Sequence, residues 1–258
     1  MAETVALVIQ AVVAWTGQLL TLAALVGLFV RRRYRLCYAF VAYLLVVLAG
    51  DLLLLLGPSK LREGQWLYGL LGAAGFYSKT FWLLKELTIN PLQFAVALEL
   101  AYRTFRSFPG ARSTARGILF LLIGITLFSV IAITPEVATA DEADYVNQMM
   151  GRLQPRVLNG TVWLLTAIGA LVLWYRLPVD RFHKAILIGL VAYLLVFTVG
   201  LNAIDTYEWS EPARQAVNYV ATTAYLVLVA YWARAAWAPL RAPAQAREPA
   251  PVLERQAG

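Results

Sequence analysis

Apolar stretches of membrane-spanning length recur along this chain, and short segments between them carry most of its charge. Of the 258 residues, 60% are hydrophobic and only 14% are charged, whereas a soluble domain has about 25% charged residues. An α-helix needs roughly 20 predominantly apolar residues to cross a bilayer. The pattern therefore predicts an all-α integral membrane protein and argues against a soluble domain.

Seven segments have the length and composition of membrane-spanning helices. They are residues 4–30, 36–56, 80–102, 117–134, 157–175, 185–201 and 216–237. Together they predict one seven-helix transmembrane domain over residues 1–238. Residues 239–258 are rich in Pro, Ala and Arg and have too little apolar content to fold alone. We expect them to form a disordered cytoplasmic tail.

The distribution of Lys and Arg predicts the orientation, because cytoplasmic loops carry an excess of these residues. With the amino terminus outside, fifteen Lys and Arg fall in inner segments and five in outer ones, and Lys79 and Lys85 in the third span complete the 22. We therefore expect a multi-pass protein of the plasma (inner) membrane with a cytoplasmic carboxyl terminus. Six tryptophans near predicted helix ends are expected to be interfacial anchors: Trp66, Trp82, Trp174, Trp209, Trp232 and Trp237.

The third span differs from the others because polar and charged residues occur along its whole length. A turn at Asn90–Pro91 would divide residues 66–105 into two spans, but it would put the arginines that follow outside. We therefore expect one helix, kinked at Pro91, and an interfacial or extended outer segment at 66–77. Ionisable groups at membrane depth normally face a bundle interior or a wet cavity. The candidate functional residues are Asp51, Lys79, Lys85, Glu86, Asn90, Gln93, Glu99 and Arg103.

Two carboxylates of this set, Asp51 and Glu86, lie at similar depth on spans that follow each other in the chain. They can form a proton or cation site in the outer half of the bundle. Alternatively, Lys85 or Lys79 neutralises one of them in a structural bridge. We expect both carboxylates to face the interior, since exposure to lipid would be costly.

The remaining candidates also have a structural and a functional interpretation. Glu99 and Arg103 are four residues apart on a helix, so they can form a salt bridge near its end or act as a coupling pair. Asn90 and Gln93 can hydrogen-bond between helices or line a ligand cavity. Polar residues of the fifth and seventh spans could line the same cavity: Asn159, Thr161, Asn218, Tyr219, Thr222, Thr223 and Tyr225.

Scarce residue types exclude several kinds of site. His183 is the only histidine and Cys37 the only cysteine, so bis-histidine haem, histidine metal clusters and disulfides within the chain are impossible. We expect no cofactor, no metal site and no catalytic residue, with Cys37 as a small apolar filler. Carboxylates such as Asp51 and Glu86 are the only groups that could catalyse an enzymatic reaction within the membrane. The net charge of +7 indicates contact with anionic membrane lipid and no nucleic acid.

Residues 5–134 carry three recognisable pieces: a first span ending in FVRRRYR, a second reading YAFVAYLLVVLAGDLLLLL, and a third ending in FAVALELAYRTF. This arrangement resembles the seven-helix amino-terminal sensor region of some bacterial histidine kinases. It is also similar to stand-alone bacterial seven-helix proteins of uncharacterised function. The resemblance implies a membrane sensing or signalling module. Kinase sensors continue into dimerisation, phosphoacceptor and ATPase segments, and only the expected tail follows here, so signalling would require a membrane or cytoplasmic protein partner.

Three functional hypotheses follow. The first is a non-enzymatic seven-helix sensor or interaction module that acts through a partner protein. The second is a small-solute or ion transporter or channel that uses Asp51, Lys85 and Glu86. The third is an accessory subunit of a membrane complex, and a homo-oligomer is compatible with all three. A transporter needs a cavity that reaches the charged helix from alternate sides, whereas a sensor needs only one outer pocket.

Overall fold

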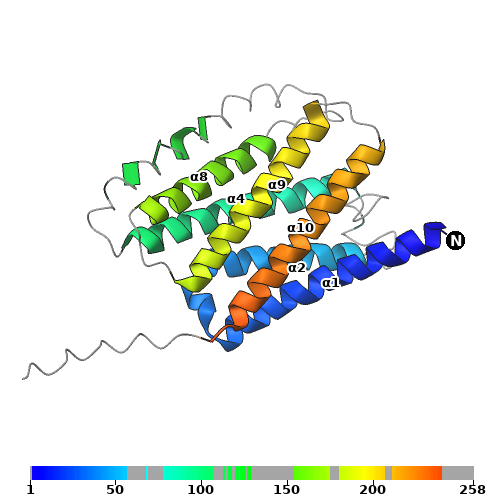
Figure 1. Ribbon diagram of the computed structural model, residues 1–258, viewed down its shortest axis with the longest axis horizontal. Coiled ribbons are helices and arrows are strands. Elements are labelled where there is room, and N and C mark those ends of the chain that lie inside the picture. The colour runs from blue at the N-terminus through cyan, green and yellow to red at the C-terminus, as the bar shows by residue number, and fades with distance from the viewer. Residues whose placement is uncertain are drawn as a thin grey trace, which may run out of the picture.

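The computed structural model describes residues 2–56, 68, 78–106, 154–174, 180–206 and 211–239, with scattered positions between 113 and 128. Every secondary-structure element in this part of the chain is helical, in agreement with the predicted fold class. The elements are α1 (Ala2–Val30), the 3₁₀-helix η1 (Arg33–Leu36), α2 (Tyr38–Leu56), α4 (Lys79–Arg106), α8 (Gln154–Trp174), α9 (Arg181–Thr206) and α10 (Glu211–Trp237), as Figure 1 shows.

Six of the seven predicted spans correspond to these α-helices. For the third span, α4 decides between one helix and two spans divided at Asn90–Pro91. It continues without a break through Pro91, so the division of residues 66–105 into two spans is wrong. The predicted fourth span (117–134) lies mostly outside the described residues. The outer segment 66–77, apart from the helical Tyr68, and the tail from 240 onward also lie outside them.

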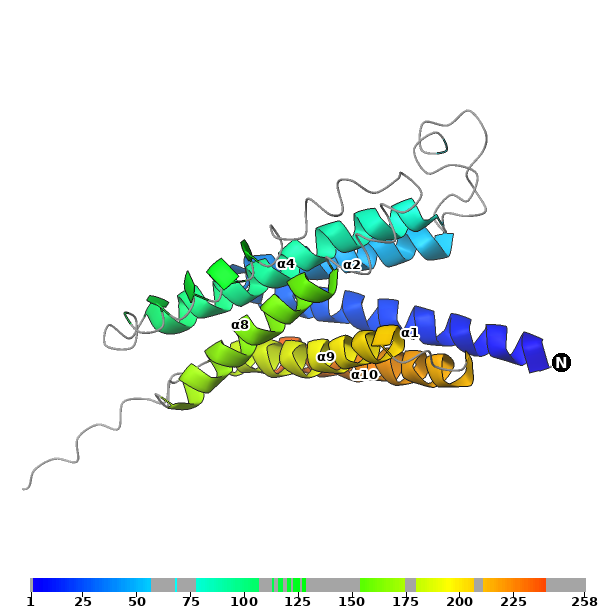
Figure 2. The same cartoon turned by 90° about the horizontal axis from the view of Figure 1, so that it is seen from above.

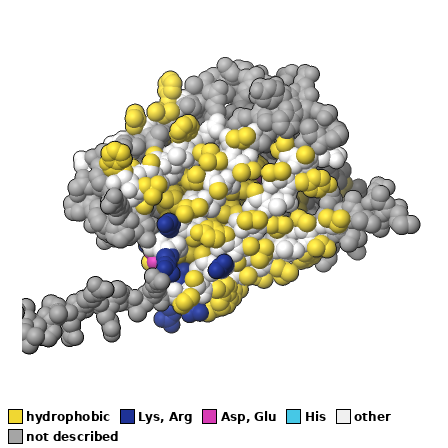
Figure 3. Space-filling model, viewed as in Figure 1, with side chains coloured by type: hydrophobic (Ala, Val, Ile, Leu, Met, Phe, Trp, Pro, Cys, Tyr) yellow, Lys and Arg dark blue, Asp and Glu magenta, His cyan; other side chains and the backbone are white. Residues whose placement is uncertain are grey.

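Four described helices are long and apolar enough to cross a membrane: Ala11–Val30, Tyr38–Leu55, Arg181–Val199 and Gln215–Trp237. Residues Leu158–Trp174 of α8 form a shorter apolar helix. The outer faces of these helices expose large apolar side chains, among them Leu19, Leu45 and Val227. A soluble protein rarely exposes so continuous an apolar surface, and Figure 3 shows it over α9 and α10.

The six α-helices close into a ring. Each packs against the next in the order α1, α2, α4, α8, α9, α10, and α10 packs against α1. In Figure 2, α1, α9 and α10 form one layer, α2 and α4 form the other, and α8 crosses between them. Neighbouring helices in the ring run in opposite directions except α4 with α8 and α10 with α1, which run in the same direction, so α1, α4, α8 and α10 all end at the same end of the ring (Figure 1). We call this the arginine end, because Arg31–Arg35, Arg103, Arg181 and Arg234 lie there.

An aromatic cluster fills the ring near the arginine end. The Phe40 ring packs edge-on against Trp232 and Phe182, with ring centroids 4.9 and 5.9 Å apart, and Tyr43 lies 6.3 Å from Trp232. Trp232 is completely buried, and its indole Nε1 donates a hydrogen bond to the Ala185 carbonyl at 3.2 Å. The expectation that Trp232 anchors an interface is therefore wrong: its side chain points into the ring, where a carbonyl satisfies its N–H. Trp82, Trp174 and Trp237 are exposed, as an anchor requires.

Close packing between α9 and α10 depends on the absence of a side chain at Gly189. A Cβ at this position would clash with Leu228 and lie 2.7 Å from Trp232 Nε1. We expect Gly189→Ala to destabilise the protein by about 1–3 kcal/mol, because overpacking forces side chains off their rotamers. Thermal unfolding in detergent measures this loss. Gly169→Ala is the matched control, since its Cβ would meet only Leu187, at an ordinary 3.8 Å; equal midpoints for the two variants would contradict the assignment.

Candidate functional site

A cavity of about 520 Å³ lies inside the ring, and all six described α-helices contribute to its wall. Its lining extends from Tyr43 to Leu55 on α2 and from Gln93 to Trp82 on α4. At 1.5 Å per residue, this is a length on the order of 17 Å. Tyr43 both lines the cavity and packs against the aromatic cluster, so the cavity extends from that cluster away from the arginine end.

One face of α4 forms the polar wall of the cavity. The residues of this face that line it are Trp82, Lys85, Glu86, Ile89, Asn90 and Gln93. Their spacing of three and four residues places them on one side of a helix. The same face continues toward the arginine end with Val96, Ala97, Leu100 and Ala101, which are all buried. The cavity therefore ends where this face of α4 changes from polar to apolar.

A buried ion pair lies in the cavity wall. The Lys85 ammonium contacts the Asp51 carboxylate, with the two side chains 10% and 21% exposed. Gln18 on α1 donates from Nε2 to Asp51 Oδ2 at 2.9 Å. The aliphatic part of Lys85 crosses α2 at Gly50, where a Cβ would lie 3.3 Å from Lys85 Cε. Three helices thus converge on Asp51, and of the two lysines considered, Lys85 forms the ion pair with it.

Both predicted interior carboxylates line the cavity, since Glu86 is part of its wall as well as Asp51. Asn90 and Gln93 line it too, in agreement with the cavity interpretation of the third span. The side chain of Lys79 lies outside the described residues. Of the polar residues suggested on the seventh span, Thr222 and Tyr225 line the cavity, whereas Tyr219 is exposed on the outer surface.

Several residues of the wall were not predicted from the sequence. Gln18, Tyr43 and Tyr193 line the cavity and come from α1, α2 and α9. A polar amide in an otherwise apolar span was the available signal for Gln18. Tyrosines are common in apolar spans, so nothing in the sequence distinguished Tyr43 and Tyr193 from packing residues. Among the described residues, the carbonyl oxygens of Gln18, Asn90 and Gln93 have no hydrogen-bond partner.

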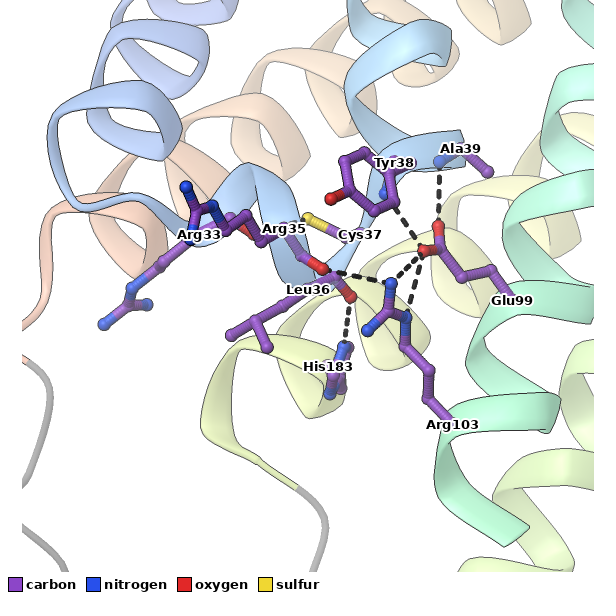
Figure 4. A network of polar contacts seen from close by, with 9 residues as sticks. All are labelled: Arg33, Arg35, Leu36, Cys37, Tyr38, Ala39, Glu99, Arg103 and His183. Atoms are coloured by element: carbon purple, nitrogen blue, oxygen red, sulfur yellow. Dashed lines mark hydrogen bonds and ion pairs between the residues drawn. The ribbon is translucent and has the colours of Figure 1, made fainter. Parts of the chain in front are cut away.

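A second polar site lies at the arginine end, and its contacts are drawn in Figure 4. Glu99 accepts hydrogen bonds from the backbone amides of Tyr38 at 3.0 Å and Ala39 at 2.8 Å. Free N–H groups at a helix N-terminus carry partial positive charge, so this carboxylate caps α2 from the neighbouring helix. Arg103 donates to Glu99 from Nε at 3.0 Å and Nη2 at 2.8 Å, and to the Arg35 carbonyl at 3.1 Å. The predicted Glu99–Arg103 pair is confirmed.

Further hydrogen bonds connect this site to α9 and α10. Arg33 is buried and donates to the carbonyls of Ala235 and Ala238, each at 2.7 Å. His183 Nε2 is hydrogen-bonded to the Leu36 carbonyl at 2.8 Å. We call Arg33, Arg35, Glu99, Arg103 and His183, with the backbone from 34 to 39, the arginine-end network. It joins the α1–α2 turn to three other helices.

Cys37 lies inside the arginine-end network. Its side chain is buried, and Sγ lies 3.4 Å from the Arg33 carbonyl. Burial, with a smaller contribution from the Glu99 carboxylate, raises the pKa of the Cys37 thiol to about 12. Because the thiolate is the reactive form, this thiol reacts slowly at neutral pH while the network is closed. These surroundings are those of the apolar filler that the sequence predicted.

The two sites are distinct in chemistry. The described residues contain no group of three or more His, Cys, Asp or Glu that could hold a metal ion. In the arginine-end network, Glu99 and Arg103 pair within the protein and Arg33 Nε is unpartnered among the described residues, whereas the cavity wall has charges and three unpartnered oxygens. Of the two sites, the cavity has the space that a bound molecule needs. No protein-family model, curated protein or solved structure matches this chain.

The contacts of Glu99 predict a specific loss of stability. In Glu99→Gln, one amide replaces a carboxylate that accepts from two backbone amides and from Arg103. We expect a cost of about 1–3 kcal/mol, because hydrogen bonds to charged groups are the strong ones and Arg103 loses its counter-charge. Thermal unfolding in detergent is the measurement, with Glu63→Gln as the control for loss of one negative charge. Identical unfolding midpoints would show that the cap contributes nothing.

Proposed function

We propose that this chain is a multi-pass protein of the plasma (inner) membrane, with its amino terminus outside and its arginine end in the cytoplasm. Four apolar helices of spanning length and the apolar outer face support insertion. The orientation is supported by the concentration of arginines at one end of the ring, as the positive-inside rule requires. In this orientation the cavity extends from the aromatic cluster toward the outside.

Within the membrane, we propose that the protein is a non-enzymatic sensor: it binds a small ligand in the cavity and changes the arginine-end network in response. One observation carries this proposal. Helix α4 supplies Lys85 and Glu86 to the cavity. Nearer its carboxyl end, the same helix supplies Glu99 and Arg103 to the network. A single continuous helix therefore joins the site that can bind a ligand to the site that would face the cytoplasm.

The step between the two sites is an exchange of partners at Asp51. A ligand that competes for Asp51 or Lys85 weakens the ion pair that holds α4 to α2 at the cavity, where Gln18 of α1 also donates to Asp51. If α4 then shifts along or about its axis, Glu99 moves relative to the start of α2, whose amides it caps. A ligand biases such an equilibrium only by its different affinity for the two states. The ion pair provides that difference.

The cytoplasmic readout in this proposal is a partner protein. Arg31, Arg32 and Arg35 are exposed or partly exposed beside the network, and the described residues at this end carry more positive than negative charge. Such a surface favours an acidic partner through electrostatic attraction. A change at Glu99 and Arg103 would alter the shape of this surface. Affinity purification from native membranes in mild detergent would identify the partner.

Labelling of Cys37 tests whether the cavity and the network are coupled. Lys85→Met removes the ion pair in the cavity, and we expect it to increase the alkylation rate of Cys37 severalfold by loosening the network. The measurement is mass-spectrometric labelling of folded protein at neutral pH. Leu87→Met is the matched control, because Leu87 lies on the exposed face of the same helix.

A second control separates coupling from general loss of stability. Gly189→Ala should destabilise the α9–α10 contact while keeping the Asp51–Lys85 ion pair, so its labelling rate gives the effect of reduced stability with the pair in place. Coupling predicts that Lys85→Met labels faster than Gly189→Ala at an equal loss in unfolding temperature. If the labelling rates of all variants follow their unfolding temperatures on one line, the sensor mechanism is wrong.

A transporter is the second candidate, because Asp51, Lys85 and Glu86 line one cavity inside the bundle. The aromatic cluster of Phe40, Trp232 and Phe182 argues for the sensor, since it fills the ring between the cavity and the arginine end. We therefore expect proteoliposomes to show no proton or sodium flux above that of protein-free liposomes. Proton- or sodium-dependent flux that Asp51→Asn and Glu86→Gln abolish would assign the transporter function instead.

A further inference from the structure

The charge on the cavity wall selects among ligand classes. Asp51 and Glu86 contribute two carboxylates, and Lys85 contributes one ammonium. Counted over the lining residues alone, the formal charges sum to one negative charge. Because charges interact more strongly in a site of low dielectric than in water, this excess favours a cation over a neutral molecule and disfavours an anion.

The unpartnered hydrogen-bond acceptors of the wall also favour a cationic ligand, one that carries N–H donors. The carbonyl oxygens of Gln18, Asn90 and Gln93 have no partner among the described residues, and these side chains are only 7%, 7% and 4% exposed. The orientation of the Gln18 amide is determined by Asp51: its NH₂ group donates to the carboxylate, and reversal would place two oxygens against each other. Its oxygen is therefore a true acceptor. Unpartnered buried acceptors are costly, so a ligand with N–H donors gains by satisfying them.

Aromatic residues complete the wall. Tyr43, Trp82, Tyr193, Phe197 and Tyr225 all line the cavity. Trp82 already receives a cation, since the Lys85 ammonium lies 4.9 Å from the centre of its ring. Aromatic faces attract ammonium groups through the ring quadrupole and provide apolar surface for the body of a ligand. A volume of about 520 Å³ is in the range of pockets that bind small organic molecules.

We propose that the cavity binds a small organic ammonium ion with an aromatic or apolar body, an arylalkylamine. The inference rests on the proposed function and names the ligand class for the same site. The ammonium lies between Asp51 and the Gln18 oxygen, where it replaces Lys85 as the partner of Asp51, and the ring of the ligand packs against the aromatic wall. Binding therefore releases Lys85, the residue that holds α4 to α2.

Three probes of nearly equal shape test the charge requirement. They are 2-phenylethylammonium, neutral 2-phenylethanol and the anion phenylacetate, each titrated at millimolar concentrations into the full chain in lipid nanodiscs. The measurements are isothermal titration calorimetry and the shift in thermal unfolding temperature. We expect saturable binding of the ammonium, at least tenfold weaker binding of the alcohol, and none of the carboxylate. Equal or tighter binding of the alcohol or the carboxylate overturns the cation assignment, as does the absence of binding by all three.

Two variants test the proposed position of the ligand between Asp51 and the Gln18 oxygen. Gln18→Met keeps both charged groups of the Asp51–Lys85 pair but removes the acceptor, together with the Nε2 donor to Asp51. We expect roughly tenfold weaker binding of 2-phenylethylammonium, the loss of one hydrogen bond to a charged group. Asp51→Asn should weaken binding further. Asp180→Asn is the control carboxylate, since Asp180 lies at the start of α9 and caps Phe182 away from the cavity. Unchanged binding by Gln18→Met overturns the proposed position.

The outcomes for the ligand class and for the sensor function are separable. Binding of phenylacetate would refute the ammonium ligand but would still show that the cavity receives a small molecule. Cys37 labelling that follows stability alone would refute the sensor mechanism without affecting the titrations. If both proposals hold, saturating 2-phenylethylammonium should itself raise the Cys37 labelling rate, and Gln18→Met should shift this response to higher concentration. A response unaltered by Gln18→Met would refute the binding site.

Discussion

Charged side chains inside a ring of apolar helices must find partners there, because burial removes the water that would solvate them. Two carboxylates that contact α4 near its two ends meet this requirement: Asp51 of α2 and Glu99 of α4 itself. Asp51 is held by Lys85 and Gln18, and Glu99 by Arg103 and two backbone amides of α2. Each carboxylate has a partner on a different helix from its own. The register of α4 against α2 is therefore determined by ionic contacts as well as by packing.

The two ends of the ring differ in how completely their polar groups are satisfied. At the arginine end, Arg33, Glu99 and Trp232 all make hydrogen bonds within the protein around a tightly packed aromatic cluster, and among the described residues only Arg33 Nε lacks a partner there. At the cavity end, three amide oxygens have no partner among the described residues. A more completely satisfied network rigidifies a structure, whereas a less satisfied one retains interaction energy for another molecule. This asymmetry is what a bundle with one binding end requires.

Most of the described fold could be predicted from the sequence, because length and apolar composition determine where a helix can cross a membrane. The interior positions of Asp51, Glu86, Asn90 and Gln93 followed from the cost of exposing them to lipid. The partner of Asp51 did not follow, since the choice between Lys79 and Lys85 depends on how α4 passes Gly50. Trp232 was misplaced because proximity to a helix end does not reveal which way a side chain points. Tyr43 and Tyr193 of the wall could be placed only from the ring order, which no local pattern encodes.

Closure of the ring by α1 and α10 has a consequence for how the protein is made. Arg33 donates to the carbonyl of Ala235, which is synthesised 202 residues later. Until α10 has been synthesised, α1 lacks its largest neighbour and the buried guanidinium lacks its acceptors. The hairpin of α1 and α2 must therefore remain incomplete during translation, a period in which chaperones and proteases act on unfinished chains. Final assembly is a late, long-range event, and a chain truncated before α10 would leave the Arg33 guanidinium without these two carbonyls.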